Sequence, residues 1–108
     1  KIIFNHQSSS KKFVSVKKII KAVSEFYEID EKEFLNRSRK KDIVKPRQVA
    51  MFLMREELKY SYPSIGEKFG GRDHTTAIHS CEKIAQELKI NSELEEELRV
   101  IKENIYSI

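Results

Sequence analysis

Residues 62–80 read YPSIGEKFGGRDHTTAIHS, and their pattern predicts a short helix, a sharp turn and a second helix. The short helix is expected over residues 64–69, and the glycine pair 70–71 can adopt a positive φ that ends it at little cost. Asp73 or Thr75 can then cap the next helix by accepting a hydrogen bond from an otherwise unpaired amide. Two helices joined by such a turn are typical of a helix-turn-helix, whose second helix can enter the major groove of DNA.

The first turn of the second helix carries the side chains that favour nucleic acid. His74, Thr75 and Thr76 offer hydrogen-bond donors, acceptors and a methyl group, which is the chemistry that reads base edges and thymine methyls. The same helix end presents unpaired amides and the positive end of the helix dipole, so a phosphate can lie beside Arg72. This combination fits DNA better than it fits a small ligand.

Upstream of this motif, the sequence predicts two helices and a basic loop. Ser15 can cap a helix over residues 16–28, in which apolar residues recur at spacings of three and four. Asp30 and Glu33 have the spacing of a capping box and introduce a short second helix. The loop over residues 37–42 reads RSRKKD, so it carries four Lys or Arg side chains. From its charges alone, this loop can be either a solvated basic surface or a contact to nucleic acid.

Two further helices flank the motif. Pro46 suits the first position of a helix over residues 46–59, because the amide hydrogen that proline lacks would be unpaired there. Ser92 and Glu95 form another capping box ahead of a final helix with one apolar face. No segment alternates with period two and no repeat is present, so the sequence predicts an all-α fold of about six helices.

Composition bounds the class of protein. The chain has 108 residues with 21 Lys and Arg against 17 Asp and Glu, which suits one small domain. No apolar run approaches the ~18 residues of a membrane span, and the start of the chain is too short and polar for a secretory signal, so a cytoplasmic protein is expected. A lone Cys81 cannot form an internal disulfide and fits a small core residue.

Charge is unevenly distributed along the chain. Residues 1–81 hold 17 basic and 10 acidic side chains, whereas residues 82–108 hold 4 basic and 7 acidic ones. Such asymmetry indicates a nucleic-acid or anionic-membrane footprint on the first three-quarters. Residues 1–14 are polar without a period and begin with Lys. They are expected to be an arm from an upstream domain, followed by a DNA-binding domain over residues 15–108.

Three separate motifs together resemble a known family. Residues 70–76 read GGRDHTT, residues 46–48 read PRQ, and Ile-Gly at 65–66 and Phe69 stand between them. With their spacing intact over about residues 14–88, these motifs resemble the C-terminal DNA-binding domain of the bacterial replication initiator DnaA. The resemblance implies a Trp-repressor-like helical domain built around a helix-turn-helix and preceded by a linker helix.

The resemblance also implies roles for individual residues. Contacts to base edges in the major groove fall on Asp73, His74, Thr75 and Thr76. Arg39, in the basic loop, is expected to contact bases in the adjacent minor groove. Contacts to the DNA backbone fall on Arg47, Gln48, Arg55, Arg72 and Lys83. Further candidates for DNA contact are Lys41, Tyr62, Pro63, His79 and Ser80. Tyr62, Ala77 and Ser80 depart from the residues usual in the family, which puts the readout at one base in question.

What the family does sets further expectations for this chain. The implied partner is double-stranded DNA, bound by a monomer at short asymmetric sites of the replication origin in the nucleoid. ATP binding is implied only for a domain outside this chain, so neither enzyme activity nor a cofactor is expected in it. Other replication proteins are possible partners. Acidic lipids are another, through the basic amphipathic helix over residues 16–28.

Other interpretations of the same residues were weighed. His74 and His79 lie five apart on a helix and so point about 140° apart, which argues against a shared metal. Asp73, His79 and Ser80 are too close on one helix to converge as a hydrolase triad. For His79 the alternative is a half-buried structural residue. A module that docks on proteins or membranes, and a transcription factor or transposase-associated reader that dimerises on palindromes, remain competing hypotheses.

Overall fold

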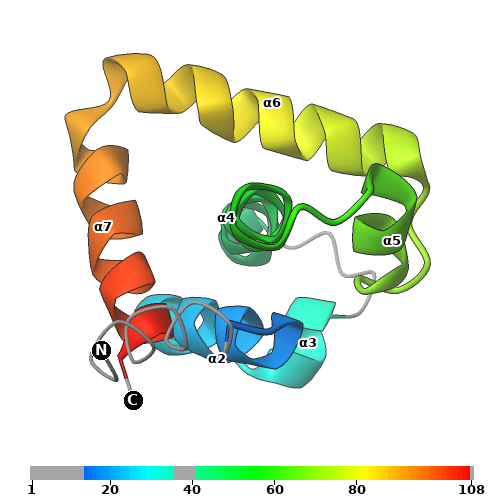
Figure 1. Ribbon diagram of the computed structural model, residues 1–108, viewed down its shortest axis with the longest axis horizontal. Helices are drawn as coiled ribbons and strands as arrows, with labels where there is room; N and C mark the ends of the chain where they lie inside the picture. The colour runs from blue at the N-terminus through cyan, green and yellow to red at the C-terminus, as the bar shows by residue number, and fades with distance from the viewer. Residues whose placement is uncertain (1–13, 36–40, 108) are drawn as a thin grey trace, which may run out of the picture.

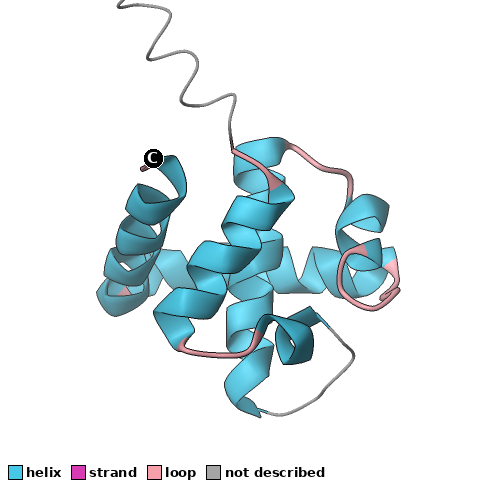
Figure 2. Ribbon diagram, turned by 90° about the horizontal axis from the view of Figure 1, so that it is seen from below, coloured by secondary structure: helices cyan, strands magenta, loops and turns pink. Residues whose placement is uncertain are grey.

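The structure is a computed structural model that describes residues 14–35 and 41–107, and the side chains from 42 onward in the second range. Its six helices are α2 (Val16–Tyr27), α3 (Glu31–Leu35), α4 (Lys41–Leu58), α5 (Tyr62–Glu67), α6 (His74–Ile90) and α7 (Ser92–Tyr106). The described ranges contain no strand, and short loops join most of the helices (Figure 2). The predicted all-α fold of six helices is confirmed. The predicted arm lies almost wholly outside the described residues, so its boundary stays a prediction.

Helix α4 forms the centre of the fold. It packs against α2, α3, α5 and α6, and Figure 1 shows it end-on with the other helices around it. Five of its apolar side chains have no exposed surface: Val49, Ala50, Met51, Leu53 and Met54. Because a helix buried on several sides needs so wide an apolar stripe, this sequence is suited to the centre of the core. The helices α5 and α6 therefore pack directly on the central helix of the core.

Helix caps confirm several predicted boundaries. The Ser15 side chain accepts a hydrogen bond from the Lys18 amide at 3.2 Å, which starts α2 as predicted. That helix ends at Tyr27, one residue before the predicted end, because Glu28 adopts a left-handed φ of 57°. The Asp30 carboxylate accepts from the Lys32 amide at 2.8 Å ahead of α3. Local side-chain chemistry thus sets where these helices begin.

The predicted start of α4 at Pro46 is wrong, because the helix begins at Lys41 and contains the proline. Pro46 lacks the amide hydrogen that would bond the carbonyl of residue 42, which costs one bond in the first turns of the helix. The added turn buries Ile43, whose side chain is only 2% exposed. Burial of this side chain offsets the missing hydrogen bond, so tertiary packing decides the boundary.

Two other predicted starts also need correction. Helix α5 begins at Tyr62 instead of residue 64, because Ser61 caps it by accepting from the Ser64 amide at 3.3 Å. Helix α7 is capped by Asn91, whose side-chain oxygen accepts from the amides of the second and third helical residues at 3.0 and 3.1 Å. Ser92 is therefore the first residue of the helix and does not form the predicted capping box.

Candidate nucleic-acid interface

The turn between α5 and α6 is fixed by a close approach of two backbones. The Gly66 carbonyl accepts hydrogen bonds from the amides of Phe69 at 3.1 Å and Arg72 at 3.0 Å. A Cβ atom at Gly66 would lie 2.2 Å from the Arg72 carbonyl oxygen, so only glycine fits without a shift of the turn. Gly70 and Gly71 have φ of 78° and 73°, as the sequence predicts. This turn determines the direction in which α6 leaves the motif.

The N-terminus of α6 is capped by Asp73, as predicted. The Asp73 carboxylate accepts from the Thr76 amide at 3.0 Å and from the Thr76 hydroxyl at 3.1 Å. These two hydrogen bonds, the backbone one first, lower the pKa of Asp73, so it is ionised at neutral pH. The Thr75 backbone amide adds a weaker hydrogen bond to Asp73, whereas the side chains of His74 and Thr75 take no part in the cap and are exposed to solvent. The first turn of α6 thus presents two side chains while two others hold its geometry.

A small hollow lies beside this turn, between α4 and α6. Its volume is about 120 Å³, and it is lined by Val44, Arg47, Gln48, Met51, Arg72, Thr76 and Ser80. Arg47 is only 4% exposed, and its Nε donates to the Phe34 carbonyl oxygen at 3.1 Å. Burial, and then the charge of Arg72, lower the pKa of Arg47. Two guanidinium groups that repel each other beside a helix N-terminus make a favourable environment for an anion.

The remaining predicted backbone contacts lie at two other places. Arg55 lies near the end of α4, where its Nη1 donates to the Tyr60 carbonyl oxygen at 2.9 Å. Its guanidinium carbon is 4.2 Å from the centre of the Tyr62 ring, a cation–π contact. Pro63 follows on the exposed surface of α5, while Lys83 is exposed further along α6. Arg55, Tyr62 and Pro63 therefore form one group, and Lys83 stands apart.

Two candidates on α6 differ in their exposure. His79 is exposed, so the alternative of a half-buried structural histidine is wrong. Ser80 is 6% exposed and borders the hollow, facing the core side of the helix instead of the open surface. Cys81 is a buried core residue, as predicted, and burial raises its pKa to about 11. Arg39 lies outside the described residues, as does the side chain of Lys41.

The other predicted properties can be compared with the described part of the chain. Within it, no group of three or more His, Cys, Asp or Glu side chains is placed to hold a metal ion. None of the helices found there is long and apolar enough to cross a membrane. The apolar face of α2 packs into the core, with Ile19 and Val23 fully buried, so the exposed surface of this helix is polar, with Lys17 and Lys21 beside Glu25. Lipid binding stays a prediction.

Sequence reasoning did not anticipate three features of this region. The hollow brings Arg47 and Arg72 together although they are far apart in the sequence. The stacking of Arg55 on Tyr62 follows from the fold of the loop before α5. Ser61 as the cap of α5 was recognisable, because a serine directly before Tyr-Pro is a typical helix start.

Comparison with known proteins identifies the family. The protein-family model described as bacterial dnaA protein helix-turn-helix matches residues 16–84 of this chain. The chromosomal replication initiator protein DnaA of Chloroflexus aggregans is 46% identical over 92 residues, which are 85% of this chain and 19% of that protein. The protein of the same name from Limosilactobacillus reuteri is 42% identical over 98 residues, covering 91% of this chain and 22% of that protein.

The chain thus spans about a fifth of the length of these relatives. The matched region includes α5, the turn after it and α6 as far as residue 84. The family match and the observed motif agree with the resemblance found in the sequence. The chain belongs to the family of bacterial DnaA helix-turn-helix domains.

Proposed function

We propose that this domain binds double-stranded DNA at specific sequences and places the N-terminal end of α6 in the major groove. The observation that carries the proposal is the first turn of α6, where His74 and Thr75 are exposed beside the hollow that Arg47 and Arg72 line. Exposed polar side chains at the start of a recognition helix are placed to contact base edges. The neighbouring hollow, with its two guanidinium groups, suits a phosphate of the same duplex.

The proposed roles divide into readout and positioning. His74 and Thr75 read base edges, and Asp73 and Thr76 hold the first turn and lie next to the same bases. Gln48, Arg55, Arg72 and Lys83 contact phosphates, while the buried Arg47 supports the phosphate site from beneath. Arg39 reads the adjacent minor groove, a role that rests on the family resemblance alone. Tyr62, Pro63, His79, Ser80 and Lys41 are secondary candidates for contact.

The biological role proposed here comes from the relatives. Both relatives described above are named chromosomal replication initiator proteins. We infer that this domain directs such an initiator to its binding sites in the cytoplasm, at the nucleoid, with one copy on each site. No part of this role requires catalysis or a cofactor within the domain. ATP binding is assigned to another part of a longer protein.

Selection from a randomised duplex library, followed by fluorescence anisotropy, tests the proposal. The selected duplex should bind at least about 10³-fold more tightly than its scramble at the same salt concentration. His74→Ala should lower affinity for the selected duplex by about 1–3 kcal/mol and leave the scramble unchanged. Gln86→Ala is the matched control, because Gln86 is exposed on the C-terminal half of the same helix. Equal effects of the two variants would exclude this assignment of readout.

Lys83→Ala tests the proposed phosphate contacts separately. Lys83 is exposed, so its removal is not expected to disturb the core as removal of the buried Arg47 would. The variant should weaken binding to all duplexes alike and reduce the slope of log affinity against log salt by about 1. A loss confined to the selected sequence would place Lys83 among the readout residues instead.

A further inference from the structure

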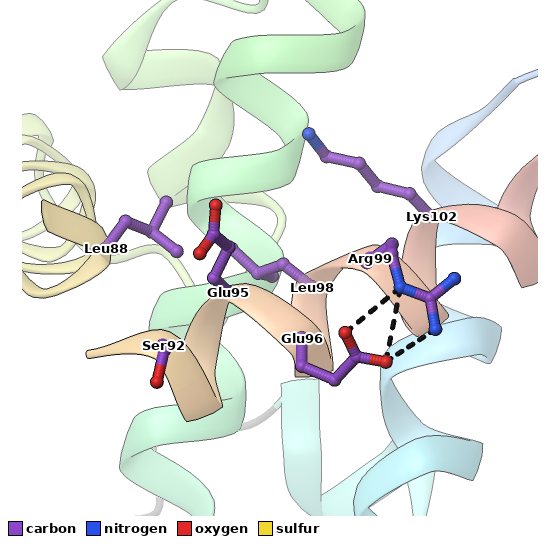
Figure 3. A pocket seen from close by; sticks show the side chains of 7 residues that line it. All are labelled: Leu88, Ser92, Glu95, Glu96, Leu98, Arg99 and Lys102. Atoms are coloured by element: carbon purple, nitrogen blue, oxygen red, sulfur yellow. Dashed lines mark hydrogen bonds and ion pairs between the residues drawn. The ribbon is translucent and has the colours of Figure 1, made fainter.

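A second and larger hollow lies at the corner between α6 and α7. It has a volume of about 710 Å³ and is lined by Leu88, Ser92, Glu95, Glu96, Leu98, Arg99 and Lys102. In Figure 3, Leu88 approaches from α6, and the charged side chains come from α7. The α7 residues recur at spacings of three and four, so they share one face of that helix. No step of the proposed DNA recognition uses this hollow.

The base of the hollow is apolar. Leu98 is 4% exposed and Leu88 is half-buried, and both belong to or pack against the hydrophobic core. Ile90, the last residue of α6, is 87% exposed but does not line the hollow. The apolar contact that the hollow offers therefore comes mainly from the half-buried Leu88, with Leu98 beneath it.

Two carboxylates and two cations line the hollow, and Glu57 and Glu103 pair with those cations from outside it, so the six side chains together carry four negative and two positive charges. Arg99 is engaged by Glu96 at 2.5 Å and by Glu103 at 2.6 Å, and Lys102 lies 3.6 Å from Glu57. Glu95 is exposed, and its side-chain carboxylate has no hydrogen-bond or ion-pair partner among the described residues. Its carboxylate is therefore available to a cation of an incoming molecule.

The position of the hollow separates it from the proposed DNA surface. It lies at the C-terminal end of α6, whereas the proposed readout residues lie at the N-terminal end (Figure 1). A helix of 17 residues spans about 25 Å, so a molecule bound at one end need not touch one at the other. The negative surplus of residues 82–108 disfavours both DNA and a second copy docking here through the same acidic surface.

We propose that the α6–α7 hollow docks a short basic segment of a partner protein, with an aliphatic side chain over Leu88 and Leu98 and a Lys or Arg beside Glu95. The apolar base provides contact area, and the acidic rim selects a cationic partner over an anionic one. The partner is able to bind while DNA occupies the other end of α6. Simultaneous binding of the two partners rests on the proposed DNA binding, whereas peptide docking does not.

An NMR titration of the domain with a peptide of Leu and Lys, with Leu at spacings of three and four, tests the docking. Amide shifts should be confined to the hollow, at Leu88, Ser92 and Leu98, and a matched Leu and Glu peptide should produce none. Repetition with the domain saturated by its selected duplex should give the same shifts. Peptide shifts in the free domain that vanish with DNA would refute simultaneous binding without refuting DNA recognition.

Charge reversal provides the decisive control. Glu95→Lys should weaken the Leu and Lys peptide about fivefold, because an attraction at the rim becomes a repulsion. Glu93→Lys makes the same charge change in the same first turn of α7, but Glu93 does not line the hollow, so its effect should stay within about twofold. Equal weakening by both variants would reduce the binding to general electrostatic attraction and overturn the proposal. Shifts at the start of α6, or self-association of the domain instead of peptide binding, would also overturn it.

Discussion

Substitution of Gly66 by Ala tests how the turn directs the recognition helix. The added methyl group would lie 2.2 Å from the Arg72 carbonyl oxygen and 3.1 Å from the Asp73 carbonyl oxygen. Both neighbours are main-chain atoms, so no flexible side chain can move aside. The turn must open by more than 1 Å to restore ordinary contact, and this strains the hydrogen bond from the Arg72 amide to the Gly66 carbonyl.

The expected loss follows from opposing contributions. Overpacking of this kind costs about 1–3 kcal/mol, and weakening one hydrogen bond adds about 1 kcal/mol. Replacing glycine by alanine within a helix raises the free energy of unfolding by about 1 kcal/mol through helix propensity alone. The free energy of unfolding should therefore fall by about 1–3 kcal/mol, toward the upper end because the 2.2 Å approach is to a main-chain atom, and Tm should fall by roughly 4–24 °C in a domain of this size.

Urea unfolding followed by circular dichroism measures this loss, with Gly71→Ala as the control. A Cβ at Gly71 meets no atom within 4 Å, although its φ of 73° is unfavourable for alanine, so this variant should lose about 1 kcal/mol. Gly66→Ala should also shift the amide resonances of the first turn of α6, and Gly71→Ala should shift them less. If Gly66→Ala were as stable as the control, with unchanged resonances there, the close approach would not set the helix direction.

Three further predictions concern titration and burial. Asp73→Ala should lower Tm at pH 7, and the difference from the wild type should shrink as pH falls below about 4, because the pKa of Asp73 is depressed from 3.8 in the folded state. A difference as large at pH 2 as at pH 7 would contradict the capping role. Cys81 should react with a thiol reagent at pH 8 at least about 100-fold more slowly in the folded domain than in urea, since burial raises its pKa to about 11; equal rates would contradict its burial. Tyr106 donates to Glu57 and its pKa is raised to about 12, so its stabilising effect should be complete below pH 10 and be lost as pH rises toward 12. Tyr106→Phe should remove that part of the alkaline loss of stability, and an identical pH profile for the variant would contradict it.

The helices could be predicted where local chemistry decides their ends. Ser15 and Asp73 cap α2 and α6 because a short polar side chain reaches amides that the helix leaves unpaired. The boundary at Pro46 could not be predicted in this way. Local preference favours proline at a helix start, whereas burial of Ile43 in the assembled core extends the helix beyond it.

The candidate site was predictable only in part for a similar reason. The exposure of His74 and Thr75 follows from their place at the start of a capped helix, and the sequence pattern indicates this place. The sequence favours an exposed position for the cationic Arg47. In the structure its Nε donates a hydrogen bond to the Phe34 carbonyl oxygen, which joins α4 to α3. Ser80 is likewise buried by the way α6 crosses α4. Contacts between helices, and the hollows that they form, depend on packing that no single segment encodes.

Chemical-shift mapping of the selected duplex on the domain tests the central claim, which is that the N-terminal end of α6 reads the DNA. On binding, the largest amide shifts should fall at His74, Thr75 and Thr76 and beside the hollow at Gln48, while α7 stays unchanged. The scrambled duplex should produce weaker shifts at the same basic surface. Shifts centred on α7, or an α6 N-terminus that is unmoved by a tightly bound duplex, would contradict the account.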